Sequence, residues 1–474
     1  MATNSIASRA ALPPATLGVA AAIFVIGGFG PNALLAVLAI AVLLSGVFLL
    51  WRPGESPILL FVFCYQWLQA SIRVFHANWR GVDVTELAHY GGDVQLATVL
   101  SLLGLLALAL GLRLGAGPWR SQDGTLARIT ASRFAPQYWF RLYVGAFLVA
   151  TFAQSVAWVV PGLSQPLLAL ASLKWAFYWM LAYATFAQSG TSRLYWLFAL
   201  ALELILGVGG YFADFKTPLI FTLLAAMTAR VRLSLGRYLG LLTLGAVTLT
   251  FSLAWTAVKV DYRSFVSGDA NAQIVTVGYL ERIAMLADMV GQLDGEALAN
   301  ASEKLLQRIA YVDFFGVVLD MVPEVLPHES GALWWDAIGR PFMPRIFFPE
   351  KAAIDDSVRT NYYTGLNLPT SEEGTSISLG YMAESYIDFG AAGMMVPIFG
   401  LGLLLGGFYR WMLRRDTSRL LGMALATAAI SGASFLESSI TKVFGGLVIA
   451  MLVSWAILRI APRYLPWMQS KMVR

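Results

Sequence analysis

The sequence is poor in the residues that mark disulfide-bonded, metal-binding and soluble proteins. Of its 474 residues, one is cysteine, three are histidine and 13% are charged. The lone Cys64 cannot form an intrachain disulfide, and no Cys/His cluster suggests a zinc site. A soluble domain would carry about a quarter charged residues. The glycine motifs of ATP-driven pumps and the G-x-S-x-G motif of serine hydrolases are missing in a fitting context, which disfavours both classes.

The chain is instead rich in long apolar runs. Hydrophobic residues make up 58% of it, and the mean hydropathy is +0.67. A helical run of about 18 or more apolar residues crosses roughly 30 Å of hydrocarbon, whereas barrel strands would alternate in short segments. We therefore predict an all-α polytopic membrane protein. Its twelve expected spans are 15–29, 32–50, 56–75, 93–114, 138–160, 167–188, 194–211, 216–230, 238–258, 381–409, 420–437 and 442–459.

Basic residues near the span ends predict the orientation. With twelve spans, all the basic clusters fall on one side of the membrane, which the positive-inside rule makes cytoplasmic. Both termini are then cytoplasmic, and the basic excess indicates topology and no nucleic-acid partner. The clusters are Arg113, Arg120, Arg128, Arg133 and Arg141; Arg230, Arg232 and Arg237; Arg410, Arg414, Arg415 and Arg419; and Arg459, Arg463, Lys471 and Arg474, together with Arg9 and Arg52.

The opposite side holds one large hydrophilic loop. Residues 259–380 contain 17 acidic and 9 basic residues and separate nine helices in 1–258 from three helices and a cytoplasmic tail in 381–474. Apolar spacing predicts two amphipathic helices in this loop, at about 277–290 and 296–321. Its later part is rich in proline and aromatic residues, which suit a membrane-interface belt or sugar stacking.

Two acidic residues lie where the loop enters the tenth span. Glu384 and Asp388 are four residues apart and should share one helix face. A carboxylate there can act as general base for a sugar hydroxyl, or it can favour the positive end of the helix. Glu372 and Glu373 are alternatives for the base. The serine and threonine residues at 375–378 are expected to cap this helix, although an anion could also bind its free N–H groups.

The basic residues of the loop are candidates for binding phosphate, because guanidinium groups recognise it with a permanent charge. For each one, pairing with a nearby acid is an equally physical explanation. Arg345 stands out because prolines on both sides stiffen its backbone. The other members of this group are Arg263, Arg282, Arg308, Arg340, Lys351 and Arg359.

Charged residues inside or at the edge of the spans are functional sites by default. Pairing that locks the bundle, such as Lys174 with Glu203, explains them as well. Arg73, at the outer end of its span, either extends to the interface or reaches a phosphate. Further residues of this kind are Asp214, Lys216, Glu437 and Lys442.

Two short motifs carry a resemblance to a known family. Residues 344–351 read PRIFFPEK, and residues 380–393 read GYMAESYIDFGAAG. Together they resemble the P-R-hydrophobic-hydrophobic-P-x-K-P and E-x-Y-x-x-F-G-x-x-G elements of bacterial O-antigen and exopolysaccharide polymerases of the Wzy type. Ala352 stands where the family often has its second proline, and Phe347 lengthens the apolar run. The motifs cover about 25 residues, and the span layout extends the likeness over the chain.

The resemblance implies a fold, a reaction and a location. The fold would be the GT-C type of metal-independent membrane glycosyltransferases, with the large loop in the periplasm and the chain in the bacterial inner membrane. The reaction would join undecaprenyl-diphosphate-linked repeat units by inverting transfer without a cofactor. The partners would be this lipid-linked oligosaccharide and membrane lipid. Whether a chain-length regulator docks is left open. By this resemblance Glu384 and Arg345 would be catalytic, and the substrate-binding residues would be Arg282, Lys351, Arg359, Arg263, Asp388 and Tyr386.

Two alternatives remain open at this stage. An O-antigen ligase shares the layout and transfers glycan to lipid A core or protein, typically using a loop histidine. The only loop histidine here is His328, in the setting LPHES, which disfavours a ligase. A lipid-linked oligosaccharide flippase is the non-enzymatic alternative, although flippases seldom carry a loop of this length.

Overall fold

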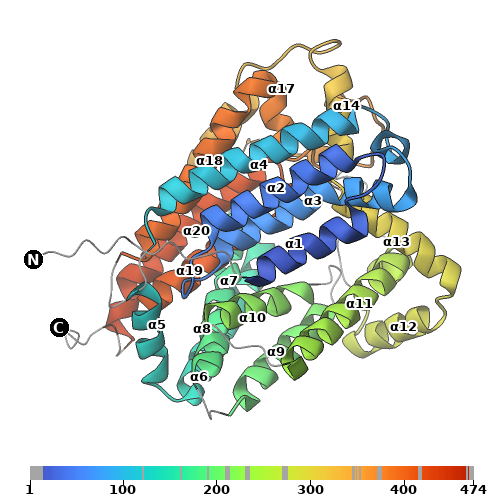
Figure 1. Ribbon diagram of the computed structural model, residues 1–474. Helices are drawn as coiled ribbons and strands as arrows, with labels where there is room; N and C mark the ends of the chain where they lie inside the picture. Colours follow the sequence, from blue (N-terminus) through green and yellow to red (C-terminus); the bar gives the residue numbers. More distant parts are fainter. Residues whose placement is uncertain are drawn as a thin grey trace, which may run out of the picture.

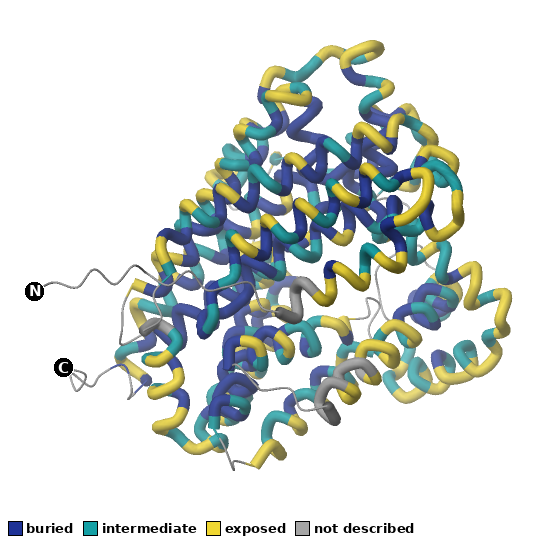
Figure 2. Tube along the Cα trace, viewed as in Figure 1, coloured by how far each residue is buried: buried dark blue, intermediate teal, exposed yellow. Residues whose placement is uncertain are grey.

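A computed structural model describes residues 14–119, 122–160, 163–188, 192–208, 214–229, 235–268, 276–343, 347–348, 350–351, 354–370, 376–414, 419–465 and 468. Within these ranges the structure is all-helical, as predicted, and contains no strand (Figure 1). Figure 2 shows that buried residues run through the middle of the helix bundle, while exposed residues concentrate on its periphery and at its ends.

The helices fall into three successive groups. The first comprises α1 (Pro14–Gly27), α2 (Ala33–Leu50), α3 (Ile58–Arg80), α4 (Val94–Ala116), α5 (Gln122–Ser132), α6 (Pro136–Val159), α7 (Ser164–Ser172), α8 (Lys174–Ala187), α9 (Leu194–Val208), α10 (Lys216–Thr228) and α11 (Leu235–Ser267). The second comprises α12 (Tyr279–Gly291), α13 (Gly295–Ile309), α14 (Val312–Met321), α15 (Ala332–Gly339) and α16 (Asp356–Thr364). The third comprises α17 (Tyr381–Gly393), α18 (Met395–Met412), α19 (Arg419–Ser431) and α20 (Ile440–Ile460).

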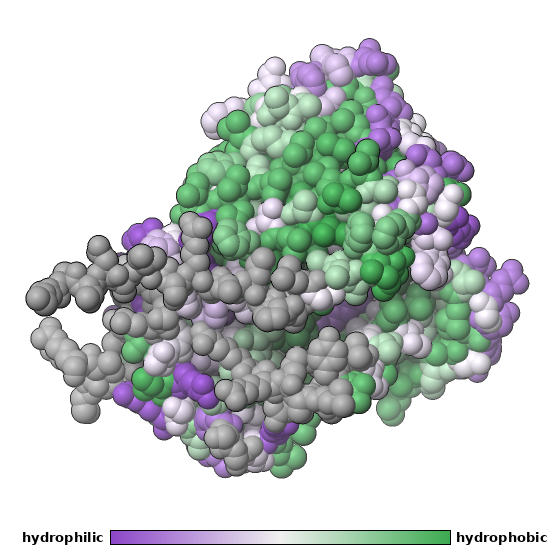
Figure 3. All heavy atoms as spheres, in the orientation of Figure 1, coloured by the Kyte–Doolittle hydropathy of each residue, from purple (hydrophilic) through white to green (hydrophobic). Residues whose placement is uncertain are grey.

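Seven helical segments of the described chain are long and apolar enough to cross a membrane. Helices occupy all twelve intervals predicted from the sequence, but the count of twelve crossings stays a prediction. Figure 3 shows a broad hydrophobic area over α2 and α4 with hydrophilic residues at its upper and right edges. Leu34 is 88% exposed on α2, as expected for a side chain that faces lipid. The seven segments are 33–50, 58–80, 94–116, 136–157, 164–187, 395–412 and 440–463.

Helices α4 and α18 form the most extensive helix pair, and glycines let their backbones touch. A Cβ atom on Gly111 would lie 2.2 Å from the carbonyl oxygen of Phe399, and one on Gly402 would lie 2.4 Å from that of Leu108. Each helix repeats a glycine four residues later, at Gly115 and Gly406. Small residues at this spacing permit the close packing that holds helices together in lipid, so this pair forms a rigid spine.

The tenth predicted span is corrected by the structure. Residues 381–409 are not one helix, because Gly390 has φ 68° and ψ −177° and kinks the chain inside α17, before α18 begins at Met395. Only the second piece, 395–412, is long and apolar enough to span. A glycine adopts this positive φ without the steric cost that a side chain would bring.

Two further predictions about the loop need correction. The ninth helical interval does not stop at 258, since α11 continues to Ser267. The helix expected at 296–321 is two helices, α13 and α14, which meet at Ala310 and Tyr311. The reason is burial: Ala301 is the one buried residue of α13, whereas Phe314 and Phe315 of α14 pack into the core, so the chain must turn between the two helices. The predicted helix at 277–290 is confirmed as α12.

Candidate functional site

The helix that carries the second sequence motif begins inside the bundle. The hydroxyl of Tyr381, the first residue of α17, donates to Oε1 of Gln66 in the middle of α3 at 2.6 Å. A Cβ on Gly104, midway along α4, would lie 2.8 Å from the sulfur of Met382. The loop before α17 therefore descends into the bundle and α17 rises out of it. Non-helical backbone at such depth is tolerated where protein surrounds it, and it often lines a site.

The non-helical segment before α17 packs directly against a second non-helical segment. Helix α19 ends at Ser431 and α20 begins at Ile440, and the backbone N–H of Tyr381 donates to the carbonyl of Ser438 between them at 2.9 Å. Gly380 has φ 83°, and a Cβ there would lie 2.4 Å from the carbonyl oxygen of Leu436. The two segments fit together only because residue 380 lacks a side chain.

The cap predicted for α17 is wrong. The residue before the helix is Gly380, and no side chain caps the first turn. Ser378 instead accepts from the N–H of Gly380 at 3.1 Å, and Ser376 accepts from Lys442 at 3.2 Å. Thr375, together with the alternative acids Glu372 and Glu373, lies outside the described residues.

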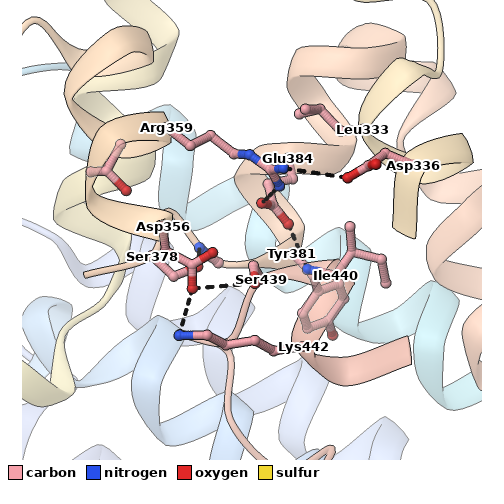
Figure 4. A network of polar contacts seen from close by, with 12 residues as sticks. Leu333, Asp336, Asp356, Arg359, Ser378, Tyr381, Glu384, Ser439, Ile440 and Lys442 are labelled. Carbon is pink, nitrogen blue, oxygen red and sulfur yellow. Dashed lines mark hydrogen bonds and ion pairs between the residues drawn. The ribbon is translucent and has the colours of Figure 1, made fainter. Parts of the chain in front are cut away.

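Glu384 is held at the centre of the junction between the two non-helical segments. Its side chain is buried, and its Oε1 accepts from Nη1 of Arg359 at 2.9 Å. Its Oε2 accepts from the backbone N–H of Ile440 at 2.6 Å, at the N-terminal end of α20. Figure 4 shows the carboxylate between these two partners. Both carboxylate oxygens are therefore engaged, one by a fixed cation and one by a helix terminus.

Arg359, on α16, links Glu384 to a second acid. Its Nη2 lies 3.7 Å from Oδ2 of Asp336, which also forms an ion pair with Nε of Arg340 at 2.7 Å. Burial lowers the pKa of Arg359, but Glu384, Asp356 and Asp336 more than offset this and leave the pKa above its ordinary value. The guanidinium is thus a permanent positive charge, 18% exposed, in a largely buried site.

Asp356 and Lys442 form the neighbouring ion pair. Nζ of Lys442 lies 2.6 Å from Oδ2 of Asp356, and the hydroxyl of Ser439 donates to the same oxygen at 3.4 Å (Figure 4). The other oxygen of Asp356, Oδ1, is buried and has no hydrogen-bond partner among the described residues. The side chain of Lys442 is 48% exposed. A buried carboxylate oxygen without a partner is costly, which suggests that it serves a ligand.

A cavity opens beside Lys442. It has a volume of about 290 Å³ and is lined mainly by small and apolar residues of α7, α19 and α20, together with the polar residues Gln165, Ser172, Ser431 and Lys442. Leu168, Gly446 and Leu447 are among the lining residues. The arrangement places a cation next to an apolar space, which suits a ligand with a charged head and an apolar tail.

The remaining predicted residues of α17 have structural partners. Oδ1 and Oδ2 of Asp388 accept from the backbone N–H groups of Leu333 and Trp334 at 3.1 and 2.9 Å. Asp388 therefore holds the N-terminal end of α15 in place. The hydroxyl of Tyr386 donates to the carbonyl of Val322 at 3.0 Å. Neither side chain joins the contacts around Glu384 that the structure shows.

The predicted basic residues are dispersed. Nζ of Lys351 donates to the carbonyls of Arg340 and Met343 at 2.7 and 3.0 Å, near the Asp336 end of the site. Arg345 lies outside the described residues. Arg263 and Arg282 lie on α11 and α12, in a region away from α17 (Figure 1). The structure thus brings together Glu384 and Arg359, with Lys351 nearby.

Of the predictions for charged residues in the spans, one is confirmed and one is corrected. The predicted pair is confirmed, with Nζ of Lys174 2.7 Å from Oε2 of Glu203. Arg73 does not extend to the interface, because its guanidinium is buried in an ion pair with Asp313 of α14, and a contact with phosphate stays a prediction. Asp313 lies 240 residues further along the chain, so the residues near Arg73 in the sequence could not predict this pair.

Sequence reasoning missed Asp336, Asp356 and Ser439. Asp355 precedes α16 and caps it, accepting from the N–H of Ser357 at 2.9 Å, and Asp356 is the first residue of the helix, where an acid needs no other explanation. Only the fold shows that Asp356 points the other way, toward α20. Among the described residues, no group of three His, Cys, Asp or Glu side chains could hold a metal ion.

Comparison with known proteins gives no relative. No family model, no curated protein and no solved structure matches this chain. The interpretation of the site rests on its geometry and on the resemblance of the two short motifs.

Proposed function

We propose that the protein is a membrane glycosyltransferase that polymerises lipid-diphosphate-linked oligosaccharide repeat units at the outer face of the bacterial inner membrane. The observation that carries the proposal is that two ion pairs, Arg359–Glu384 and Asp356–Lys442, lie together where two non-helical segments meet. A largely apolar cavity borders Lys442. A polyprenyl diphosphate has the same two parts, an anionic head and an apolar tail. Asp356 and Arg359 lie between the two motifs that resemble Wzy-type polymerases, and Glu384 lies within the second motif.

The chemistry requires a cation and a base. In inverting transfer, the acceptor hydroxyl oxygen bonds to the anomeric carbon while the bond from that carbon to the diphosphate breaks. The diphosphate leaves with the bonding electrons, and fixed cations stabilise it. Lys442, exposed at the cavity, and Arg359 are the described cations in position for this, and Arg345 stays a predicted contributor from the resemblance.

A carboxylate accepts the proton of the acceptor hydroxyl, and we assign this role to Asp356. Both oxygens of Glu384, the base predicted from the sequence, are already engaged by Arg359 and Ile440. Asp356 keeps one oxygen without a partner. In this mechanism Glu384 is a positioning residue that fixes the guanidinium of Arg359, and Asp356 is the general base.

The test is complementation of a strain that lacks the native gene, with membrane abundance checked by blot. We expect Asp356→Asn to lower polymerisation by about 10² to 10⁴-fold, the usual contribution of a general base. With purified protein, Asp356→Asn should lower kcat with little change in KM, whereas Glu384→Gln should raise KM for the lipid-linked donor. The exposed acid Asp320 of α14 supplies the control, Asp320→Asn, which should polymerise normally.

Two outcomes would contradict the proposal. If the Asp356→Asn variant is well expressed and makes normal polymer, Asp356 is not the general base. If single repeat units never reach the outer face even with a polymerase supplied in trans, the protein is a flippase and the mechanism is wrong.

A further inference from the structure

The opposite end of the bundle contains a cavity lined by arginines. It has a volume of about 260 Å³ and lies where α4 and α18 end. Four arginines line it, with one carboxylate, Glu55. The arginines are Arg52, Arg410, Arg414 and Arg419.

This cavity is separate from the candidate functional site. Met382 packs at Gly104, whereas the cavity borders Ala116 at the other end of α4, about 18 Å further at 1.5 Å per residue. In Figure 1 the C-terminal ends of α4 and α18 lie away from α14 and α17. The basic-residue distribution predicts that this end is cytoplasmic.

Topology alone does not explain two of these arginines. Residues that set orientation need only be near the span ends, and exposed positions suffice. Arg52 and Arg419 are instead 8% and 7% exposed. Arg52 pairs with Glu55 at 3.2 Å, and Nε of Arg419 donates to the carbonyl of Leu413 at 3.1 Å. Burying a charge is expensive, so two buried guanidinium groups around a cavity indicate a built binding site.

The backbone is also shaped to bring the guanidinium groups together. Gly117, just after α4, has φ 68°, and its carbonyl accepts from both Arg52 and Arg113. A Cβ on Gly117 would lie 2.9 Å from Nη1 of Arg410. A side chain at this position would therefore displace Arg410 from the cavity.

The charge of the cavity defines its ligand. Four arginines and one glutamate give a net charge of +3, and planar guanidinium groups bind phosphate oxygens in pairs. A second hollow of about 650 Å³ lies on the adjacent face of α18, lined by apolar residues of α18 and α20 that include Trp411 and Trp455. Trp411, which lines this apolar hollow, is next in the sequence to Arg410 of the arginine cavity, at the end of α18.

We propose that the arginine cavity binds the phosphate headgroup of an anionic membrane lipid, with its acyl chains along the apolar hollow between α18 and α20. Basic pockets between membrane helices on the cytoplasmic side are suited to such headgroups. A free phosphate ion has the same charge chemistry but no use for the apolar hollow. The lipid is therefore the favoured source of the phosphate.

The experiment uses the purified full-length protein in phosphatidylcholine nanodiscs. Binding of added phosphatidylglycerol is titrated by native mass spectrometry, and thermal stability is followed in parallel with phosphatidylglycerol, phosphatidylcholine or inorganic phosphate. The test variant is Arg410→Ala/Arg414→Ala, because both residues are exposed and their loss should leave the fold intact. The matched control, Arg133→Ala/Arg141→Ala, removes the same charge from exposed positions on the same predicted side.

The expected result is selective binding of phosphatidylglycerol that the test variant weakens about tenfold or more and the control leaves unchanged. Arg414→Glu, a single charge reversal, should weaken it as well. Equal binding of phosphatidylcholine, or wild-type affinity in the test variant, would overturn the proposal. Stabilisation by inorganic phosphate equal to that by phosphatidylglycerol would overturn the lipid assignment.

Discussion

Two buried ion pairs of this protein differ in their surroundings, although both join a glutamate to a cation from another helix. Glu203 lies within the continuous helix α9, and its two oxygens accept from Tyr143 and Lys174 at 2.8 and 2.7 Å. Lys174 also lies 4.6 Å from the ring centre of Trp175. Both oxygens of Glu203 have a protein partner, and neither Glu203 nor Lys174 lines any of the three cavities described above.

The Glu384 site has the opposite character. Its helices are broken, its neighbour Asp356 keeps an oxygen without a partner, and a cavity adjoins Lys442. The comparison shows that a charge inside a membrane protein does not by itself indicate function. Open hydrogen-bonding capacity beside a ligand-sized space separates a candidate site from a structural lock.

The largest effect on stability is expected from Lys174→Met. The change leaves the carboxylate of Glu203 buried without its cation, so we expect the protein to lose about 3–5 kcal/mol of stability. Thermal unfolding in detergent measures the loss. The double variant Lys174→Met/Glu203→Gln, which removes both charges, should recover most of it, and a failure to recover would show that the pair does more than lock the bundle.

A smaller effect is expected from packing without charge, at the contact of α4 with α18. Gly402→Ala introduces a methyl group 2.4 Å from a backbone oxygen and should cost about 1–3 kcal/mol. Gly400 lies on the same helix with nothing within 4 Å of an added Cβ. Gly400→Ala should unfold at or slightly above the wild-type temperature, because alanine favours the helix more than glycine does. An equal loss of stability in both variants would show that the contact with α4 is not the cause.

The smallest effect is expected from Tyr143→Phe. It removes one of the two hydrogen bonds to Glu203, but Lys174 still pairs with the carboxylate, so we expect a loss of about 1.5 kcal/mol, the low end for a hydrogen bond to a charged group. Comparison of the unfolding temperatures of Tyr143→Phe and Lys174→Met measures the difference. A larger loss in Tyr143→Phe would mean that the hydroxyl and not the cation stabilises Glu203.

Much of the fold follows from apolar periodicity, because each long apolar run must become a helix to cross lipid. The pair Lys174–Glu203 could be predicted because both residues are isolated charges in apolar runs. The break at Gly390 could not, since a glycine is common inside membrane helices and the apolar pattern continues across it. Asp356 was missed for a related reason: its role depends on α20, whose start lies 84 residues further along the chain.

The most direct test of the central claim compares two charge-neutral double variants. Arg359→Met/Glu384→Gln and Lys174→Met/Glu203→Gln each remove one buried pair, and membrane abundance and thermal unfolding establish that both are folded. Surface glycan is then read on gels in a strain that lacks the native gene. We predict long polymer with the Lys174/Glu203 variant and single repeat units with the Arg359/Glu384 variant. Long polymer with both would contradict the assignment of the Glu384 site to catalysis.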